Sequence, residues 1–193
     1  MSLVLWNNRW VWLGGGLIVG LLLTGFWPDA PLHATATDRT ETFAVATGPV
    51  DGETEMVIML DFLTGDMAGR VLGPQSAKFQ AFYQTNVIAA LTTVITQINA
   101  GKGAGRARKA GGGEAIEVPQ KPRFLMVTGA VNIRRRGAAR PGACAVYVVE
   151  TTTGIVMAFG FPWAPEVISQ GRVYNGQFIL LDSECFRVNA AAQ

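Results

Sequence analysis

Cysteine and histidine, which often carry metal, redox or nucleophilic chemistry, are nearly absent from this chain. Its 193 residues include two cysteines, Cys144 and Cys185, and one histidine, His33. The cysteines have no Cys-x-x-Cys spacing, so neither a zinc site nor a thiol redox centre is expected. A single histidine, in a segment that we expect to be a tether, also leaves no Ser-His-Asp arrangement. The two cysteines either form one disulfide or remain two buried thiols, and the sequence leaves both alternatives open.

Charged residues are also few, at 16% of the chain, and the net charge of +2 gives no argument for nucleic acid as a partner. The carboxylates that come nearest to a catalytic set are Asp61, Asp66, Glu150, Asp182 and Glu184. Each stands at an expected strand end or turn, where such a side chain usually accepts hydrogen bonds from backbone amides. We therefore expect no enzyme activity, no cofactor and no bound metal.

One long segment, residues 10–27, contains no charge at all. As a helix it spans roughly 27 Å, close to the roughly 30 Å hydrocarbon core of a bilayer. Arg9 precedes the segment and Asp29 follows it, so the positive-inside rule places the N-terminus in the cytoplasm. The sequence thus predicts a single-pass protein of the bacterial inner membrane with a periplasmic C-terminal domain.

Two further features concern this N-terminal segment. Gly16 and Gly20 are four residues apart, so on a helix they form a small face on which a partner membrane helix can pack closely. The ordinary enrichment of glycine in membrane helices is the competing explanation. A cleaved signal peptide is the alternative to an anchor, because Ala34-Thr35-Ala36 fits the small-x-small cleavage rule.

The rest of the chain suffices for one domain. We divide it into an anchor (1–27), a tether with two prolines (28–41) and an extracytoplasmic domain (42–193), consistent with 49% hydrophobic residues overall. Strands are expected at 43–47, 55–61, 67–72, 123–133, 146–150, 155–161 and 178–181. The strand at 55–61 is so continuously apolar that we expect neither of its faces to be solvated.

Two of the expected hairpins share a turn sequence. Asp61 is followed by Thr64 and Gly65, and Glu150 by Thr153 and Gly154, with the same spacing. The acidic side chain is suited to accept turn amides, and the glycine to supply a positive φ. The hairpins resemble blade hairpins of quinoprotein-type β-propellers. The resemblance covers about fifteen residues per copy and occurs twice, where a propeller needs at least four blades, so we reject a propeller and expect the hairpins to be neighbours in one sheet.

A long helix is expected between the hairpins. Apolar residues recur at helical spacing through 76–100, with Pro74 before and Gly101 after them. Residues 101–114 are rich in glycine and basic residues and have no large apolar side chain, and this composition predicts a mobile basic loop. The expected fold is therefore α+β, a mostly antiparallel sheet of six or seven strands with one long helix packed on one face and the other face needing cover.

Basic residues gather in two stretches that flank one expected strand. They are Arg106, Arg108 and Lys109, and then Arg134, Arg135 and Arg136, with Arg140 nearby. If the stretches converge, their arginines suit bidentate contacts with an anionic ligand, lipid headgroup or acidic surface. Solubilising loops are the competing explanation.

The stretch 124–129, Phe-Leu-Met-Val-Thr-Gly, followed by an arginine cluster, together with the Asp-x-x-Thr-Gly hairpin, resembles small membrane-anchored bacterial proteins of unassigned function. That resemblance implies no activity. Our first hypothesis is a non-catalytic accessory or structural subunit of a larger membrane or envelope complex, contributing a packing helix and an outer interaction domain. The alternative is a periplasmic module that binds or senses an anionic ligand. Partners would be the membrane and other membrane-protein subunits, with homo-oligomers allowed.

Overall fold

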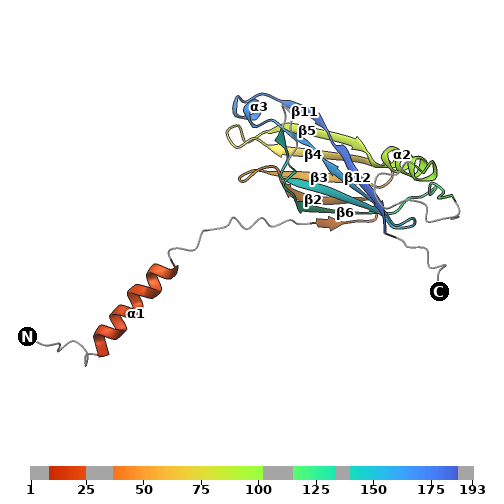
Figure 1. The fold of residues 1–193 in the computed structure, drawn as a ribbon. Helices are drawn as coiled ribbons and strands as arrows, with labels where there is room; N and C mark the ends of the chain where they lie inside the picture. Colours follow the sequence, from red (N-terminus) through yellow and green to blue (C-terminus); the bar gives the residue numbers. More distant parts are fainter. Residues whose placement is uncertain (1–8, 25–36, 102–114, 134–139, 187–193) are drawn as a thin grey trace, which may run out of the picture. The chain divides into compact units, whose positions relative to one another are not determined.

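The computed structural model describes residues 9–24, 37–101, 115–133 and 140–186. The chain divides into two compact units, Met1–Leu32 and His33–Gln193 (Figure 1). The boundary falls inside the segment predicted as a tether, although a short strand already begins at Thr37. The elements in chain order are α1 (Arg9–Thr24), β1 (Thr37–Arg39), β2 (Phe43–Pro49), β3 (Glu55–Asp61), β4 (Asp66–Leu72), β5 (Phe79–Asn86), α2 (Val87–Asn99), β6 (Phe124–Ala130), β7 (Arg140–Pro141), β8 (Cys144–Glu150), β9 (Ile155–Gly160), β10 (Pro162–Trp163), α3 (Pro165–Ser169), β11 (Tyr174–Gln177) and β12 (Ile179–Cys185).

The first unit contains the helix α1, and it corrects the membrane prediction. Its 16 residues have a length of about 24 Å, against a bilayer core of about 30 Å. Within the described parts of the chain, no helix is both long enough and apolar enough to cross a membrane. The predicted transmembrane anchor, the single-pass topology and the inner-membrane localisation derived from it are therefore wrong. Gly16 and Gly20 lie one turn apart on α1, where an added Cβ would meet nothing within 4 Å.

The second unit consists mainly of two sheets, which also corrects the predicted fold class. Sheet A has the order β1-β2-β3-β4-β5-β11, and sheet B has the order β12-β9-β8-β6. All neighbours are antiparallel except β5 and β11, which run parallel. A two-stranded ribbon, β7 with β10, completes the strands of the described residues. Of the residues that the structure describes, 48% are in strands and 19% in helices, so this part of the chain is mostly β and not an α+β fold with a single sheet.

Each sheet contains the same four-stranded meander. In sheet A it runs β2-β3-β4-β5, and in sheet B it runs β6-β8-β9-β12. The last two strands pair in the same register, Asp66 opposite Asn86 and Ile155 opposite Cys185. The residue after each meander donates its N–H to the carbonyl of the turn glycine, Val87 to Gly65 at 2.7 Å and Phe186 to Gly154 at 3.0 Å. The two hairpins thus lie in different sheets, not side by side in one.

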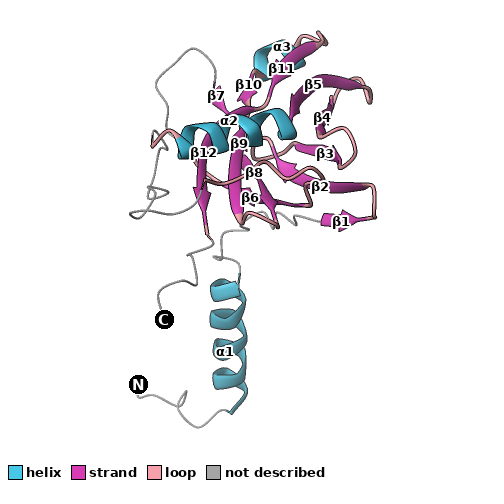
Figure 2. Ribbon diagram, turned by 90° about the vertical axis from the view of Figure 1, so that its right-hand side faces the viewer, coloured by secondary structure: helices cyan, strands magenta, loops and turns pink. Residues whose placement is uncertain are grey.

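The long predicted helix is shorter than expected and does not cover a sheet face. Residues 79–86 form β5, and α2 begins at Val87 after Asn86, whose side chain accepts the N–H of Ala89 at 2.9 Å. Figure 2 looks along the strands and shows α2 lying across one end of the domain, between the two sheets. There the buried side chains of α2 join the core. One helix therefore closes the end of a structure built from two similar halves.

A single hydrophobic core joins the inner faces of both sheets. Its fully buried side chains include Ile58 and Leu60 from sheet A and Ile155 and Met157 from sheet B. The chain passes from sheet A to sheet B between β11 and β12, and Phe178 fills that crossing. Aromatic rings meet around it in one cluster, with centroids 5.2 to 6.0 Å apart, made of Tyr83, Phe161, Tyr174 and Phe178. The phenol of Tyr83 donates to the carbonyl of Pro162 at 2.7 Å.

Candidate functional site: the outer face of sheet B

The outer face of sheet B is apolar over its central strands. Along β6, β8 and β9 the side chains alternate between the core and the outside, as the period of two in a strand requires. Cross-strand partners form two outward rows, Leu125 with Val149 and Val156, and Val127 with Tyr147 and Ala158. We call these six residues the apolar face. Leu125 is 43% and Val127 is 49% exposed, and the other four are partly exposed.

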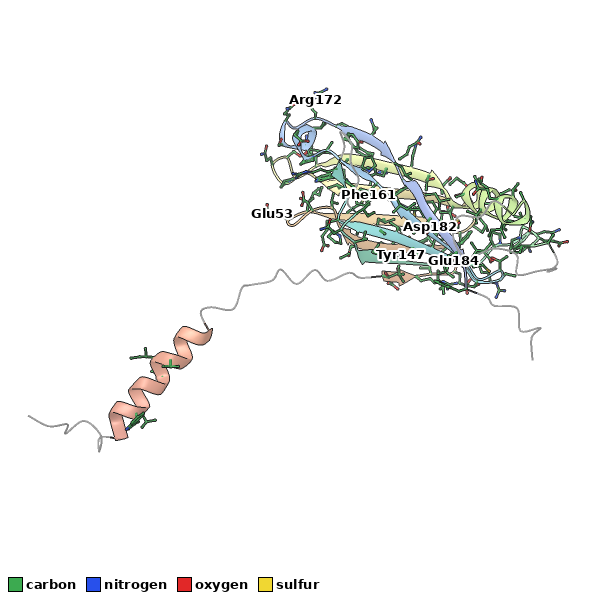
Figure 3. The ribbon with its side chains drawn as sticks, viewed as in Figure 1. Glu53, Tyr147, Phe161, Arg172, Asp182 and Glu184 are labelled. Atoms are coloured by element: carbon green, nitrogen blue, oxygen red, sulfur yellow. The ribbon has the colours of Figure 1, made fainter. Side chains whose placement is uncertain are left out.

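Charged residues of opposite sign border the apolar face on its two sides. On β12, Glu184 lies opposite Val156 and Asp182 lies opposite Ala158, so both rows end in a carboxylate. On the other side, Arg123 immediately precedes β6 and is exposed, two residues before Leu125 and thus on the same face. Figure 3 labels Tyr147, Asp182 and Glu184, which come from the same sheet. The face therefore has an apolar centre, a basic corner and an acidic edge.

The outer face of sheet A is different because polar residues interrupt it. Val57 and Met59 on β3 are 45% and 46% exposed, but Val57 lies opposite Arg70. The guanidinium of Arg70 lies 5.0 Å from the centroid of the Phe82 ring and donates to the carbonyl of Tyr83 at 3.2 Å. Sheet A thus carries one apolar row across three strands, Val45 with Met59 and Ala68, whereas sheet B carries two adjacent rows, which makes sheet B the better candidate surface.

The prediction for the turn carboxylates is confirmed at both hairpins. Asp61 accepts the N–H groups of Leu63 at 2.7 Å and Thr64 at 3.2 Å. Gly65 and Gly154 have φ of 75° and 74°, the left-handed region that favours glycine. At both hairpins the carboxylate oxygens therefore hold the turn backbone.

The second turn is built around Glu150, which is fully buried. Burial acts to raise the pKa of this carboxyl, but hydrogen bonds from Thr153, Thr152 and Arg123 outweigh it and lower the pKa. The N–H and the hydroxyl of Thr153 donate to Oε2 at 2.6 and 2.7 Å. The N–H of Thr152 and of Arg123 donate to Oε1 at 3.0 and 3.2 Å. The carboxylate is therefore held ionised as a structural group.

A depression of about 530 Å³ lies on sheet A. Its lining residues are Asp66, Ala68, Gln84, Thr85, Asn86 and Gln177. Asn86 donates to Asp66 and to the carbonyl of Thr64, both at 2.9 Å, and caps α2. These polar groups stabilise the start of α2. In the part of the chain that the structure describes, no group of three or more His, Cys, Asp or Glu side chains is arranged to hold a metal ion.

The two cysteines are not joined to each other in a disulfide. Cys144 begins β8, whereas Cys185 lies opposite Ile155, which pairs with Glu150 at the far end of the same strand. Six residues of strand separate these ends by roughly 20 Å, far beyond the reach of a disulfide. Burial, with a smaller contribution from the charge of Glu55, raises the pKa of Cys144 to about 12. Of the two side chains, Cys144 is buried and Cys185 is only partly buried.

The predicted basic patch lies outside the described residues. Arg106, Arg108 and Lys109 fall in 102–114, and Arg134, Arg135 and Arg136 fall in 134–139. Ile133 and Arg140, which border the second stretch, are described, and Ile133 lines a depression of about 460 Å³ together with Gly142 and Ala143. The anionic partner of these residues stays a prediction.

Comparisons of the chain with protein-family models, with curated proteins and with solved structures found no match. The resemblance to small membrane-anchored bacterial proteins therefore stays untested. The apolar face and its charged borders are therefore the features of this chain that bear on its function.

The sequence contains a signal for this face that lies outside the two hairpin turns. The pattern Phe-x-x-x-Thr-Gly-x-Val occurs at 43–50 and again at 124–131, ahead of each hairpin. It marks β2 and β6 as equivalent first strands, and so predicts two meanders. In the second copy, the apolar residues occupy both alternating positions of three consecutive strands. That pattern identifies a sheet with apolar side chains on its outer face as well as its inner one.

Proposed function

We propose that this protein is a non-catalytic interaction domain that serves as a structural or accessory subunit of a protein assembly. The apolar face of sheet B is the binding surface. One observation carries the proposal, the two rows of apolar side chains that cross three strands and remain partly or largely exposed. Contiguous exposed apolar areas of this kind, bordered by polar residues, are typical of protein–protein contacts.

The chemistry of the borders defines the partner surface. Desolvation of the apolar centre supplies the free energy of binding, whereas the carboxylates of Asp182 and Glu184 and the guanidinium of Arg123 set the orientation. The partner therefore presents an apolar area with a basic side and an acidic side. The carboxylates of Asp61 and Glu150 hold turns and Cys144 is buried, which supports binding in preference to catalysis.

A photocrosslinking experiment tests this surface. A photoreactive phenylalanine analogue at Val127 should give a discrete protein adduct in cells that make the full chain from its own gene. The matched control is the same analogue at Val57, a valine of nearly equal exposure, 45% against 49%, on the outer face of sheet A. We expect adducts from position 127 and few from position 57.

A second change makes the result specific. Leu125→Glu, introduced into the chain that carries the photoreactive analogue at position 127, places a charge in the centre of the apolar face. We expect the yield of the adduct to fall by about tenfold, as for loss of a central apolar contact. Equal adducts from both positions, or an adduct that Leu125→Glu does not reduce, would contradict the proposed function.

A further inference from the structure

We propose that the occupant of the apolar face is a second copy of this chain. The inference rests on the proposed function and adds the identity of the partner. In the resulting dimer, the sheet B faces of two copies stack with a two-fold axis that runs parallel to the strands, between β8 and β9. Each β6 then lies over β12 of the other copy.

The charge pattern selects this arrangement. A two-fold axis along the strands brings the basic corner of one copy over the acidic edge of the other, so Arg123 faces Glu184 of the other copy. The offset along the strands is about two residues, or about 7 Å. A two-fold axis across the strands would instead stack β12 on β12 and oppose four carboxylates, two from each copy. Only the first arrangement pairs opposite charges.

The two-fold arrangement also matches the apolar centres of the two copies. A two-fold interface uses the same surface on both subunits, so an apolar centre meets an apolar centre. Face-to-face sheets stack about 10 Å apart with aligned strands, a spacing filled by outward side chains such as Leu125, Val127 and Tyr147. The Tyr147 ring leans over Gly129, because an added Cβ there would lie 3.1 Å from its Cε2. The ring thus extends the apolar area toward the end of β6.

The size of the face predicts a weak dimer. Four strands about 4.8 Å apart and about 20 Å long give roughly 400 Å² per copy. That area is below the roughly 800 Å² per partner of a stable interface, and it belongs to the weak, reversible class. We therefore expect monomers at low micromolar concentration and dimers near millimolar concentration.

Sedimentation equilibrium of the full chain, combined with charge reversal, tests the arrangement. Arg123→Glu and Glu184→Arg should each weaken dimerisation by about tenfold, since each contact occurs twice in a two-fold interface. The double variant Arg123→Glu with Glu184→Arg restores opposite charges and should recover the original dissociation constant to within about threefold. Rescue by the double variant separates a contact across the interface from a loss of folding.

Matched controls use exposed charges elsewhere on the domain. Arg172→Glu and Glu53→Arg make the same changes at the end opposite α2 (Figure 3), and we expect neither to affect dimerisation. A chain that stays monomeric near millimolar concentration would overturn the inference, as would a dimer indifferent to both charge reversals and to Leu125→Glu. In either case, a Val127 adduct with a different protein would leave the proposed function intact. Loss of that adduct as well would remove both.

Discussion

Glu150 is the buried charge on which the second hairpin depends. Its two oxygens accept three backbone N–H groups and one hydroxyl, all at 3.2 Å or less. Arg123 belongs to the preceding β6 region, so this side chain ties the turn to the neighbouring strand as well as closing it. Such a fully satisfied buried carboxylate stabilises the fold only while it is ionised.

The pH dependence of stability follows from the lowered pKa of Glu150. Because this pKa is lower in the folded chain than in the unfolded chain, the unfolded state binds the proton more readily. The contribution is therefore fully present above the unfolded pKa of about 4.5 and is lost as pH falls through the folded pKa. We expect Glu150→Gln to lower the free energy of unfolding at pH 7 by about 1–3 kcal/mol, because its amide places a donor against N–H donors.

Urea unfolding between neutral pH and about pH 3 measures both effects. The loss caused by Glu150→Gln should shrink as pH falls. Asp61→Asn is the matched control, since Asp61 occupies the equivalent turn position but is only partly buried and accepts the N–H groups of Leu63 and Thr64. A constant loss at every pH, or a larger loss for Asp61→Asn, would show that ionised Glu150 does not hold the turn.

The turn of the first hairpin depends on a close approach to α2. Gly65 has φ of 75°, and a Cβ there would lie 2.6 Å from Cγ1 of Ile88. We expect Gly65→Ala to lower the free energy of unfolding by about 2–4 kcal/mol, the sum of left-handed backbone strain and overpacking. Gly101→Ala isolates the first effect, because Gly101 has φ of 70° and nothing within 4 Å of an added Cβ. It should lose only about 1–2 kcal/mol.

Thermal or urea unfolding of the two glycine variants separates strain from packing. If Gly65→Ala cost no more than Gly101→Ala, the turn would tolerate movement away from Ile88. The hairpin and helix α2 would then be less tightly joined than their contacts indicate.

The hairpins were predictable because their chemistry is local. Asp61, Thr64 and Gly65 specify a turn within five residues, and the second copy repeats the arrangement. The start of α2 was not predictable from apolar spacing. Phe79 and Phe82 continue a helical spacing although they belong to β5. Aromatic residues and Thr85 favour a strand there, and Asn86 is the capping residue that marks the true start. Propensity and capping decide here where periodicity is ambiguous.

Local sequence patterns did not predict how the strands are arranged in two sheets. Strand β3 was correctly bounded, but Val57 and Met59 point outward and are nearly half exposed, so its continuous apolar sequence did not mean burial on both faces. The number of strands was also underestimated, because short strands such as β10 and β11 form only by pairing with distant segments. Pairing partners far apart in sequence are what the local pattern cannot encode.

The two meanders share one core, and this joins them thermodynamically. Neither inner face is covered without the other, since the buried residues of both sheets form a single cluster. Tyr83 and Phe178 pack at the crossing between the sheets, with ring centroids 5.8 Å apart. Although the chain contains two similar halves, its stability is therefore expected to be a property of both together.

Matched core truncations test this cooperativity. Ile58 on β3 and Ile155 on β9 are both fully buried, one in each sheet. We expect Ile58→Ala and Ile155→Ala each to cost about 2–5 kcal/mol and to lower the same calorimetric transition of the β domain, by roughly 5–15 °C. Ile→Val at the same positions, at about 0.5–1.5 kcal/mol, replaces them if the alanine variants do not fold. Two separate transitions, each lowered only by the substitution in its own sheet, would instead mean that the halves unfold independently. The shared core makes a single transition the expected outcome, because unfolding either meander exposes the inner face of the other.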